Sequence, residues 1–452
     1  MKSYEVVVVG AGSGLNVLGP CVEAGHSVAI IEGDKFGGTC ANRGCIPSKM
    51  FIYTADIAES IARGAEFGVH ATVDRVDWPE LQKQVWGRMD PGSEMNEQWH
   101  RDLDGLDVYK GYARFIEDKV LEVNGERIKA ENVVVSVGTR PSVPAIPGLD
   151  GVPYITSDEA LRIPQLPRRM TVIGAGYIGA EIAHMFGSLG TEVTIIGRGP
   201  RLLKNEDDAV SERFTEVFGR AHRLIVDASF KSVSHRDGNF TVNVVADGQE
   251  HSVESDALLV ATGRRANTDK LGIENTGVEV DGKGFIKVDP YLHTNVEGIW
   301  ALGDIVPTQS FKHSANQEGR LVAHNIHNPT DLKAMDYHAT PHAVFASPQV
   351  AGVGLTERDA KAAGIPYDVS QRSYDSIAWG MASHETDGFA KIIRHAGSHE
   401  VLGAHVIGPH ASIVIQQMVA AVRLKMTTDE LARVVYAHPA LPELIENAVL
   451  DF

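Results

Sequence analysis

Cysteine is scarce in this chain, with three residues among 452: Cys21, Cys40 and Cys45. So few cysteines exclude the disulfide framework of a small secreted protein. No apolar run reaches the ~18 residues that a membrane-spanning helix needs, so an integral membrane protein is also excluded. A strand-like apolar run starts at residue 6, which leaves no room for a signal peptide before it. We therefore expect a cytoplasmic protein.

Positive charge is also in deficit, because 42 Lys and Arg stand against 59 Asp and Glu, for a net charge of -17. This balance disfavours nucleic acid and anionic membranes as partners, so a small molecule is expected instead. No low-complexity segment or block of charge interrupts the chain. Hydrophobic residues make up 43% and charged residues 22% of the chain, which predicts folded domains with large cores. At ~150 residues per domain, the length predicts three of them.

Glycine is plentiful. Its first cluster, Gly10, Gly12 and Gly14, directly follows the apolar run at residues 6–9. A buried strand, a tight glycine turn and a helix together form the unit that binds the pyrophosphate of a dinucleotide. The unit usually has a third glycine where this chain has Leu15. We expect looser or compensated helix packing there, with Gly14 as a partial substitute.

The same organisation returns far downstream. A strand is predicted over residues 170–173, and Gly174, Gly176 and Gly179 follow it, with a further strand over residues 193–196. Two such units in one chain predict two bound nucleotides, which is a more specific indication than either motif alone.

The residue after the second strand of each unit distinguishes the two nucleotides. Gly25 and Gly190 each end the predicted first helix of their unit. Aligning the two units on these glycines places Glu32 opposite Gly197. An acid at this position accepts both ribose hydroxyls of an unphosphorylated adenosine, as FAD requires. Gly197 instead leaves room for a 2'-phosphate, so the second unit is predicted to bind NADPH.

Basic residues next to Gly197 support this assignment. Arg198 follows it directly, and Arg201 and Lys204 come soon after. Guanidinium and ammonium groups pair with a 2'-phosphate. The alternative is a basic turn that is only solvated.

The remaining pattern predicts a discontinuous first domain. A strand in residues 133–139 leads into a proline-rich crossover at 144–147. Residues 298–304 return to the first unit after the strand at 258–263 closes the second. Hairpin strands at 389–394 and 401–407, followed by helices from Ala411 and Thr428, form a third domain without a nucleotide motif. The predicted domains are residues 1–150 and 270–337 for FAD, 151–269 for NADPH, and 338–452 for an interface.

Two of the three cysteines, Cys40 and Cys45, lie five positions apart at the start of a helix predicted to run through Ala58. Such a pair can close a small disulfide ring, and the helix dipole is expected to lower the pKa of a thiol there. Two buried, inert thiols are the alternative, but the neighbouring FAD motif favours a redox pair. Cys21 stands alone on the first helix and is predicted to be a core residue.

Disulfide chemistry also needs a proton donor for the departing thiolate, and histidine titrates in the useful range. His438 is the candidate, because Glu443 follows two prolines and could turn back to orient the ring. His324 and His327 are better explained as surface or packing residues. No spacing of ligand residues predicts a metal site.

Together these residues resemble the pyridine nucleotide-disulfide oxidoreductases of the glutathione reductase and dihydrolipoamide dehydrogenase type, over nearly the whole chain. Four segments carry the resemblance in the family's order: residues 37–49, 174–181, 301–304 and 438–443. It implies an α/β fold with two Rossmann-like dinucleotide-binding domains, for FAD and NADPH, and a C-terminal α+β dimerisation domain. It also implies a homodimer whose active sites are shared across the interface.

The resemblance implies roles for the catalytic residues. Cys40 would attack the substrate disulfide, and Cys45 would be the charge-transfer thiol against the flavin. His438, with Glu443, would be the acid-base pair, contributed across the dimer interface.

Roles at the cofactors follow from the same resemblance. Lys49 and Glu181 would pair beside the flavin, Asp304 would hold its ribityl chain, and Tyr177 would cover the nicotinamide pocket until NADPH displaces it. The implied cofactor-binding set also includes Gly38, Thr39, Gly138 and Gly263.

Within the family, residues 50–51, 76–78, 87–91 and the segment after His438 are most similar to the branch that reduces mycothione, the disulfide of mycothiol. The expected function is NADPH-dependent reduction of mycothione to two mycothiols through FAD and the cysteine pair. A dihydrolipoamide dehydrogenase is the nearest alternative, but it would normally carry an acid in place of Gly197.

Other members fit less well. Glutathione disulfide is anionic, and no basic cluster marks a site for it. Mercuric reductases and the large thioredoxin reductases use extra C-terminal cysteines, and none follows Cys45. A soluble transhydrogenase need not have the cysteine pair, and an inactive nucleotide-binding scaffold need not keep Cys40, Cys45 and His438.

Overall fold

A computed structural model describes all 452 residues, and the chain forms two compact units. The first unit comprises Met1–Ser48, Pro79–Ser142 and Arg264–Tyr337, and the second comprises Lys49–Trp78, Val143–Gly263 and His338–Phe452. The three domains predicted from the sequence stay predictions. None of the helices is both long and apolar enough to cross a lipid bilayer.

The first unit is built on a mixed sheet in the order β3-β2-β1-β6-β5-β4, with β16 added beside β6. Parallel pairing joins β1 to β2 and β6, β2 to β3, and β6 to β16, whereas β4 and β5 pair antiparallel. The strands are β1 (Lys2–Val9), β2 (Val28–Glu32), β3 (Leu106–Lys110), β4 (Arg114–Glu117), β5 (Val120–Val123), β6 (Glu126–Val135) and β16 (Ile299–Ala301). The predicted return of the chain to the first sheet after residue 298 is therefore confirmed.

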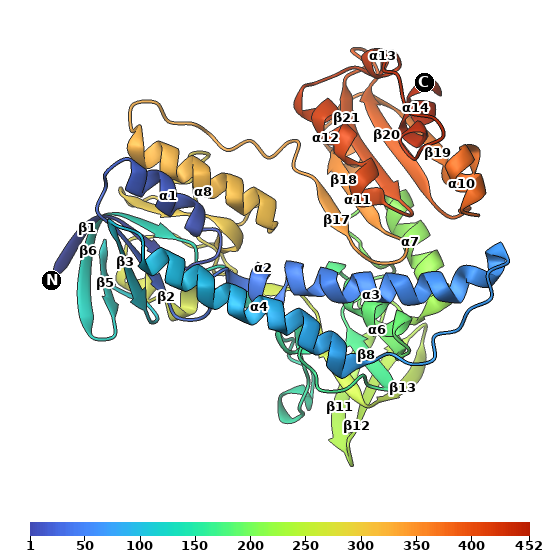
Figure 1. Cartoon of the computed structure of the whole chain (residues 1–452), viewed down its shortest axis with the longest axis horizontal. Coiled ribbons are helices and arrows are strands. Elements are labelled where there is room, and N and C mark those ends of the chain that lie inside the picture. The colour runs from blue at the N-terminus through green and yellow to red at the C-terminus, as the bar shows by residue number, and fades with distance from the viewer. The chain divides into compact units, whose positions relative to one another are not determined.

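The apolar run in β1 is buried on both faces. Val6 and Val8 pack in the core beneath helices α1 (Leu15–Glu23) and α8 (Lys312–His327), whereas Val7 and Val9 belong to the core on the opposite face. Figure 1 shows α1 and α8 side by side over the sheet. An uninterrupted run of valines suits this position, because a parallel strand covered on both faces has no polar side.

The glycine turn after β1 explains how the first unit tolerates Leu15. A Cβ added to Gly14 would lie 2.6 Å from the carbonyl oxygen of Gly10 and 2.7 Å from the side chain of Val8. A Cβ at Gly179 in the second unit would lie 2.5 Å from the carbonyl of Gly174. Gly14 thus makes the close helix-to-strand contact, which is the compensation expected for Leu15.

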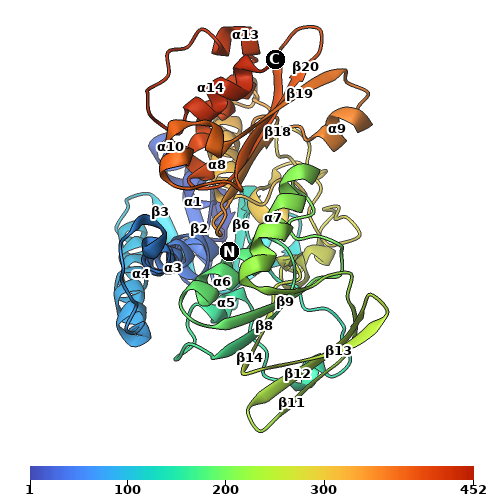
Figure 2. The ribbon, with the colours of Figure 1, turned by 90° about the vertical axis from the view of Figure 1, so that its right-hand side faces the viewer.

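The second unit contains the other glycine turn, on a parallel sheet in the order β10-β9-β8-β14. Its strands are β8 (Arg169–Ile173), β9 (Glu192–Ile196), β10 (Arg223–Ile225) and β14 (Ala257–Val260). Helix α6 (Tyr177–Ser188) packs against β8 and β9. An antiparallel sheet of β11 (Ser229–Arg236), β12 (Asn239–Ala246) and β13 (Gln249–Ser255) shares a core with it. Figure 2 shows the two sheets next to each other.

A five-stranded antiparallel sheet, in the order β17-β18-β21-β20-β19, forms the C-terminal part of the second unit. The predicted hairpin is confirmed as β20 (Phe389–His395) and β21 (Val401–Ile407). The other strands are β17 (His342–Val344), β18 (Val350–Gly354) and β19 (Tyr367–Ser373). Four helices share its core: α11 (Ala411–Val414), α12 (Gln416–Arg423), α13 (Thr428–Leu431) and α14 (Glu443–Leu450).

The other elements, of which β7 and β15 pair with each other, lie between these strands in the chain. They are α2 (Gly38–Arg43), α3 (Cys45–Arg63), α4 (Trp78–Arg101), β7 (Thr139–Pro141), α5 (Ser157–Ala160), α7 (Asp208–Ala221), β15 (Arg264–Ala266), α9 (Glu357–Ala362) and α10 (Ala378–Ala382), with short 3-10 turns between. Helix α3 extends beyond the predicted end at Ala58, because no Pro or Gly lies between Ala58 and Gly64.

Replacing Gly14 with Ala should destabilise the first unit by about 1–3 kcal/mol, since the new methyl group overpacks the turn. Gly19, in the middle of α1, is the matched control because a Cβ added there meets nothing within 4 Å. Ala at position 19 should leave the thermal unfolding midpoint unchanged or raise it. Equal midpoints for the two variants would contradict the packing role of Gly14.

Candidate functional site

The first glycine turn is arranged around the carboxylate of Glu32. This carboxylate accepts hydrogen bonds from the backbone N–H of Ala11 at 2.7 Å and of Asp34 at 2.6 Å. Burial raises the pKa of Glu32, although the hydrogen bond from Ala11 and the positive charge of Lys110 oppose the effect. The acid predicted to accept ribose hydroxyls therefore lies directly beside the glycine turn, and the donor and acceptor set suits a dinucleotide.

Close backbone approach also favours a nucleotide at this turn. Gly12 lies against Gly38, where an added Cβ would be 2.8 Å from the Gly12 Cα. Gly38 and Thr39 begin α2, the short helix that contains Cys40. The first glycine turn and the cysteine segment are therefore neighbours within the first unit.

Three more predicted cofactor residues gather near β7 and β15. The Asp304 carboxylate lies 3.3 Å from the Thr139 hydroxyl and 4.0 Å from the Arg264 guanidinium. Gly138 and Gly263, which precede Thr139 and Arg264, both have positive φ angles, 61° and 117°, so glycine suits each turn. These turns bring residues far apart in the sequence to one place.

The two cysteines lie on consecutive helices and are free thiols. Cys40 is in α2 and Cys45 is the first residue of α3, where Cys45 is exposed and Cys40 half-buried. A hydrogen bond with Cys45, together with burial, raises the pKa of Cys40. This contact opposes the lowering expected from the helix dipole, which stays a prediction for the cysteine pair.

Lys312 is a residue of this site that sequence reasoning missed. It is the first residue of α8, and its ammonium donates a hydrogen bond to the Ser13 hydroxyl at 3.1 Å. It forms no ion pair, yet it interacts electrostatically with both Cys40 and Cys45. Burial lowers the pKa of Lys312, and its charge favours the thiolate form of Cys40. No motif indicated it, because only the fold brings α8 to the cysteines.

Lys49 and Glu181 form an ion pair within the second unit. The Lys49 ammonium lies 2.6 Å from one carboxylate oxygen of Glu181, and the other oxygen accepts the backbone N–H of Phe345 at 3.0 Å. The Lys49 ammonium also lies 4.6 Å from the centre of the Phe345 ring. The pair expected from the resemblance is therefore formed, between α3 and α6.

The second glycine turn supplies another reason for the glycine at position 197. A Cβ added to Gly197 would lie 2.9 Å from the Cβ of Ala175, which stands between Gly174 and Gly176. Close packing against the turn thus favours glycine here, in addition to the room that a 2'-phosphate needs.

The basic residues near Gly197 divide into two kinds. Arg201 pairs with Asp208 at 2.8 Å and Glu212 at 2.5 Å, so its charge is already neutralised within the chain. Arg198 and Lys204 are exposed, and no ion pair of the structure involves either side chain. These two remain the candidates for a phosphate contact.

The predicted acid-base pair is formed near the C-terminus. Nδ1 of His438 lies 2.7 Å from Oε1 of Glu443, and the other carboxylate oxygen accepts the backbone N–H of Ala440 at 2.7 Å. The His438 side chain is 73% exposed. Hydrogen bonds from His438 and Ala440 lower the pKa of Glu443, so the carboxylate stays ionised and orients the ring with Nε2 outward.

Cys21 lies in the core as predicted. Its side chain lies on the buried face of α1, and burial raises the pKa of this thiol to about 11. The unpredicted cluster of Asp56, Glu59 and His184 lies in the second unit, where ligand atoms approach within 4.8 Å of one another. The 2.8 Å ion pair between His184 and Asp56 accounts for the position of the buried ring.

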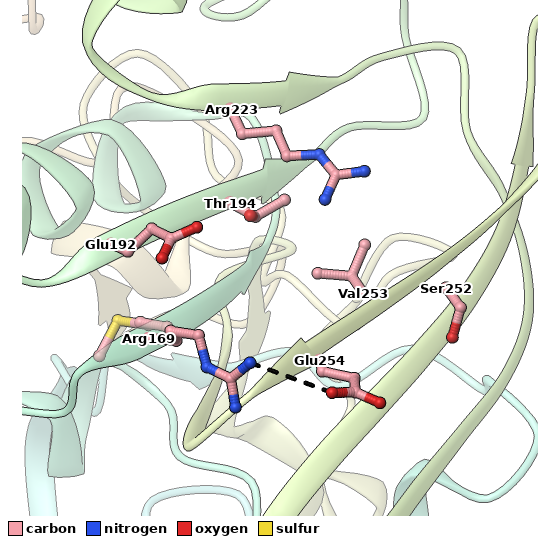
Figure 3. Close-up of a pocket in the computed structure, with 8 residues that line it drawn as sticks. Arg169, Glu192, Thr194, Arg223, Ser252, Val253 and Glu254 are labelled. Atoms are coloured by element: carbon pink, nitrogen blue, oxygen red, sulfur yellow. Dashed lines mark ion pairs between the residues drawn. The ribbon is translucent and has the colours of Figure 1, made fainter.

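A pocket on the second unit lies at the amino ends of the parallel strands, opposite the ends that carry the glycine turn. Figure 3 shows the residues that line it. Arg169, Glu192 and Arg223 line it, and each is the first residue of its strand. The nucleotide site of such a sheet lies at the carboxyl ends of the strands, where Gly174 follows Ile173. The pocket is therefore not the nucleotide site.

Comparison with known proteins agrees with this geometry. The family model "Pyridine nucleotide-disulphide oxidoreductase" matches residues 4–323, and the model of the family's dimerisation domain matches residues 340–449. The chain therefore belongs to the pyridine nucleotide-disulfide oxidoreductases, with their glutathione reductase-like fold, and enzymes of this class use FAD and NAD(P)H.

Several members of the family match along the whole chain. Mycothione reductase of Mycobacterium tuberculosis is 39% identical, covering 100% of this chain and 99% of the relative. A mercuric reductase of Staphylococcus aureus is 34% identical, covering 99% of this chain and 82% of that one, and a dihydrolipoyl dehydrogenase of Chlamydia muridarum is 34% identical, covering 99% and 97%. The HOCl-induced flavoprotein disulfide reductase RclA of Escherichia coli, solved with Cu(II), has a TM-score of 0.88 at 26% identity, covering 100% and 99%.

Replacing Lys312 with Met should raise the pH at which the cysteine pair of the reduced enzyme first ionises, by about one unit, because a nearby positive charge favours a thiolate. The pH dependence of alkylation by iodoacetamide measures this midpoint. Lys83, on α4 with 81% of its side chain exposed, is the control, and Met there should leave the midpoint unchanged. An unaltered midpoint in the Lys312 variant would show that its charge does not act on the cysteines.

Proposed function

We propose that this flavoprotein uses NADPH to reduce mycothione to two molecules of mycothiol. The observation that carries the substrate assignment is the 39% identity to a mycothione reductase over the full length of both chains. The mercuric reductase and the dihydrolipoyl dehydrogenase are less similar, at 34% each. No cysteine follows Cys45, which disfavours an enzyme that relies on C-terminal thiols.

The preference for NADPH rests on charge beside the second glycine turn. Arg198 and Lys204 are exposed and unpaired there, and Gly197 adds no negative charge. An NADH-specific site normally has an acid at this position, which would repel a 2'-phosphate. The close contact of Gly197 with Ala175 also favours glycine, so the two basic residues are the stronger support.

Residues of the first unit would hold FAD. Gly10, Gly12 and Gly14 would face its pyrophosphate, Glu32 its adenosine ribose, and Asp304 its ribityl chain. When bound, FAD supplies two-electron transfer between the nicotinamide and the cysteine pair. Lys49 and Glu181 form the ion pair that would lie beside the flavin.

The chain's own groups carry the disulfide exchange. In the reduced enzyme, Cys40 attacks one sulfur of mycothione, forming a mixed disulfide and releasing one mycothiol as its thiolate. His438, oriented by Glu443, donates the proton that this thiolate needs. Cys45 then attacks Cys40, which releases the second mycothiol and closes the Cys40–Cys45 disulfide.

A homodimer is part of the proposal, since residues 340–449 match a dimerisation domain. The 73% exposure of His438 within one chain suits a residue that completes the active site of a partner. Two such sites would then form in each dimer.

Turnover of the FAD-loaded protein with different substrates tests the proposed function. NADPH oxidation should be rapid with mycothione and slow with glutathione disulfide, and dihydrolipoamide should not reduce NAD⁺ efficiently. A Cys40→Ser variant is the control and should lose turnover with every disulfide. Preferred oxidation of dihydrolipoamide by NAD⁺ would overturn the assignment and identify a dihydrolipoamide dehydrogenase.

Replacing Arg198 with Ala should raise the KM for NADPH by about tenfold to a hundredfold and change the KM for NADH little, since a charge-assisted hydrogen bond to the phosphate is lost. Arg201→Ala is the matched control from the same loop, because Arg201 is paired with Asp208 and Glu212. That variant should retain the selectivity for NADPH. If Arg198→Ala raised the KM for NADPH and the KM for NADH equally, the proposed contact between Arg198 and the 2'-phosphate would be contradicted.

A further inference from the structure

A buried carboxylate in the second unit binds the tyrosine at the nucleotide turn. The side chain of Glu206 is 0% exposed. It accepts hydrogen bonds from the Tyr177 hydroxyl and, at 2.7 Å, from Nε2 of His342. Tyr177 follows Gly176 directly and is the first residue of α6, whereas His342 begins β17 of the C-terminal sheet. One acid thus joins the nucleotide turn to a different sheet.

The position of Glu206 is set by its backbone. The Glu206 carbonyl accepts a hydrogen bond from the Arg358 guanidinium at 2.9 Å, and its N–H donates to the carbonyl of Leu203 at 2.9 Å. The next residue, Asp207, is fully buried and pairs with the Lys391 ammonium at 2.7 Å. The carboxylate therefore has little freedom to follow a tyrosine that moves away.

Packing also fixes the positions of the Tyr177 and His342 rings. Tyr177 and His342 stack with their centres 6.2 Å apart and their planes 5° from parallel. His342 packs beside the buried ring of His405, and Gly352 provides the space, since an added Cβ there would lie 2.7 Å from Cε1 of His342. Nε2 of His405 lies 3.0 Å from the Leu355 carbonyl, so this ring is fixed from its other side.

Charge makes the bond from Tyr177 strong. Burial by itself would raise the pKa of Glu206, but the hydrogen bonds from His342 and Tyr177 outweigh it, and the pKa of this acid lies below its usual range. Burial and the neighbouring carboxylate raise the pKa of Tyr177, so its hydroxyl stays a donor. A hydroxyl donating to an ionised, buried acceptor is a stronger bond than one between neutral groups.

We propose that Glu206 and His342 are positioning residues that hold Tyr177 in the closed position at the nucleotide turn. NADPH must then break the bond between Tyr177 and Glu206 to enter, so part of its binding free energy is spent on opening. This inference rests on the proposed function, in which Tyr177 covers the nicotinamide pocket.

Equilibrium binding of NADP⁺ to the FAD-loaded protein, followed by flavin fluorescence, tests the proposal without disulfide turnover. Tyr177→Phe keeps the ring and removes only the hydroxyl, and it should lower the Kd for NADP⁺ by about tenfold. Glu206→Gln weakens the same bond from the acceptor side and should lower the Kd by several-fold. Steady-state assays should show both effects in the KM for NADPH more than in kcat.

The double variant separates positioning from a general structural effect. If Glu206 acts through Tyr177, adding Glu206→Gln to Tyr177→Phe should change the Kd for NADP⁺ less than twofold. Tyr154→Phe is the control, because it removes a tyrosine hydroxyl of the same unit that forms no hydrogen bond within the chain. That variant should bind NADP⁺ as the wild type does.

Two results would overturn the proposal. One is an unchanged or increased Kd in Tyr177→Phe, a variant that keeps every buried charge and so avoids the folding risk of Glu206→Gln. The other is an equal effect of Glu206→Gln with and without the Tyr177 hydroxyl. Failure of the proposed function is distinct, because the wild type would then bind NAD⁺ in preference to NADP⁺, and the same cycle would be measured with NAD⁺.

Discussion

Close backbone packing at the two glycine turns is the constraint on which both predicted nucleotide sites depend. A side chain at Gly10 would meet the Ser136 carbonyl at 2.5 Å, and one at Gly174 would meet the Ala261 carbonyl closer still. Only glycine allows this approach, and it also fits the positive φ of both turns. The helix N-terminus is thereby placed at the carboxyl end of the sheet, where a pyrophosphate binds.

Buried charge is handled by pairing throughout the second unit. Glu181 binds Lys49, Asp207 binds Lys391, and Glu206 is satisfied by His342 together with Tyr177. An ionised group taken from water is tolerated only with such partners. In the first unit, Lys312 forms no ion pair and interacts electrostatically with Cys40, Cys45 and Asp304, which suits a group whose charge acts on a thiolate.

Local patterns in the sequence predicted much of the fold and part of the candidate site. The valine run before Gly10 predicted β1, because a strand buried on both faces needs no polar alternation. His438 and Glu443 were linked by their spacing, and their side chains do meet. The sequence also suggested that Arg201 could bind phosphate, but Asp208 and Glu212 occupy it, and neither acid could be connected to Arg201 by a motif.

The amino-acid sequence alone was sufficient to predict the two glycine turns, the cysteine pair and the family, since each of these predictions rests on residues close together in the chain. Tertiary structure was needed to show that Gly14 replaces the missing third glycine, that Lys312 lies near the thiols and that Glu206 binds Tyr177. Each of these depends on groups that folding brings together from separate elements, and hydrogen bonds and charges between such groups leave no periodic trace in the sequence.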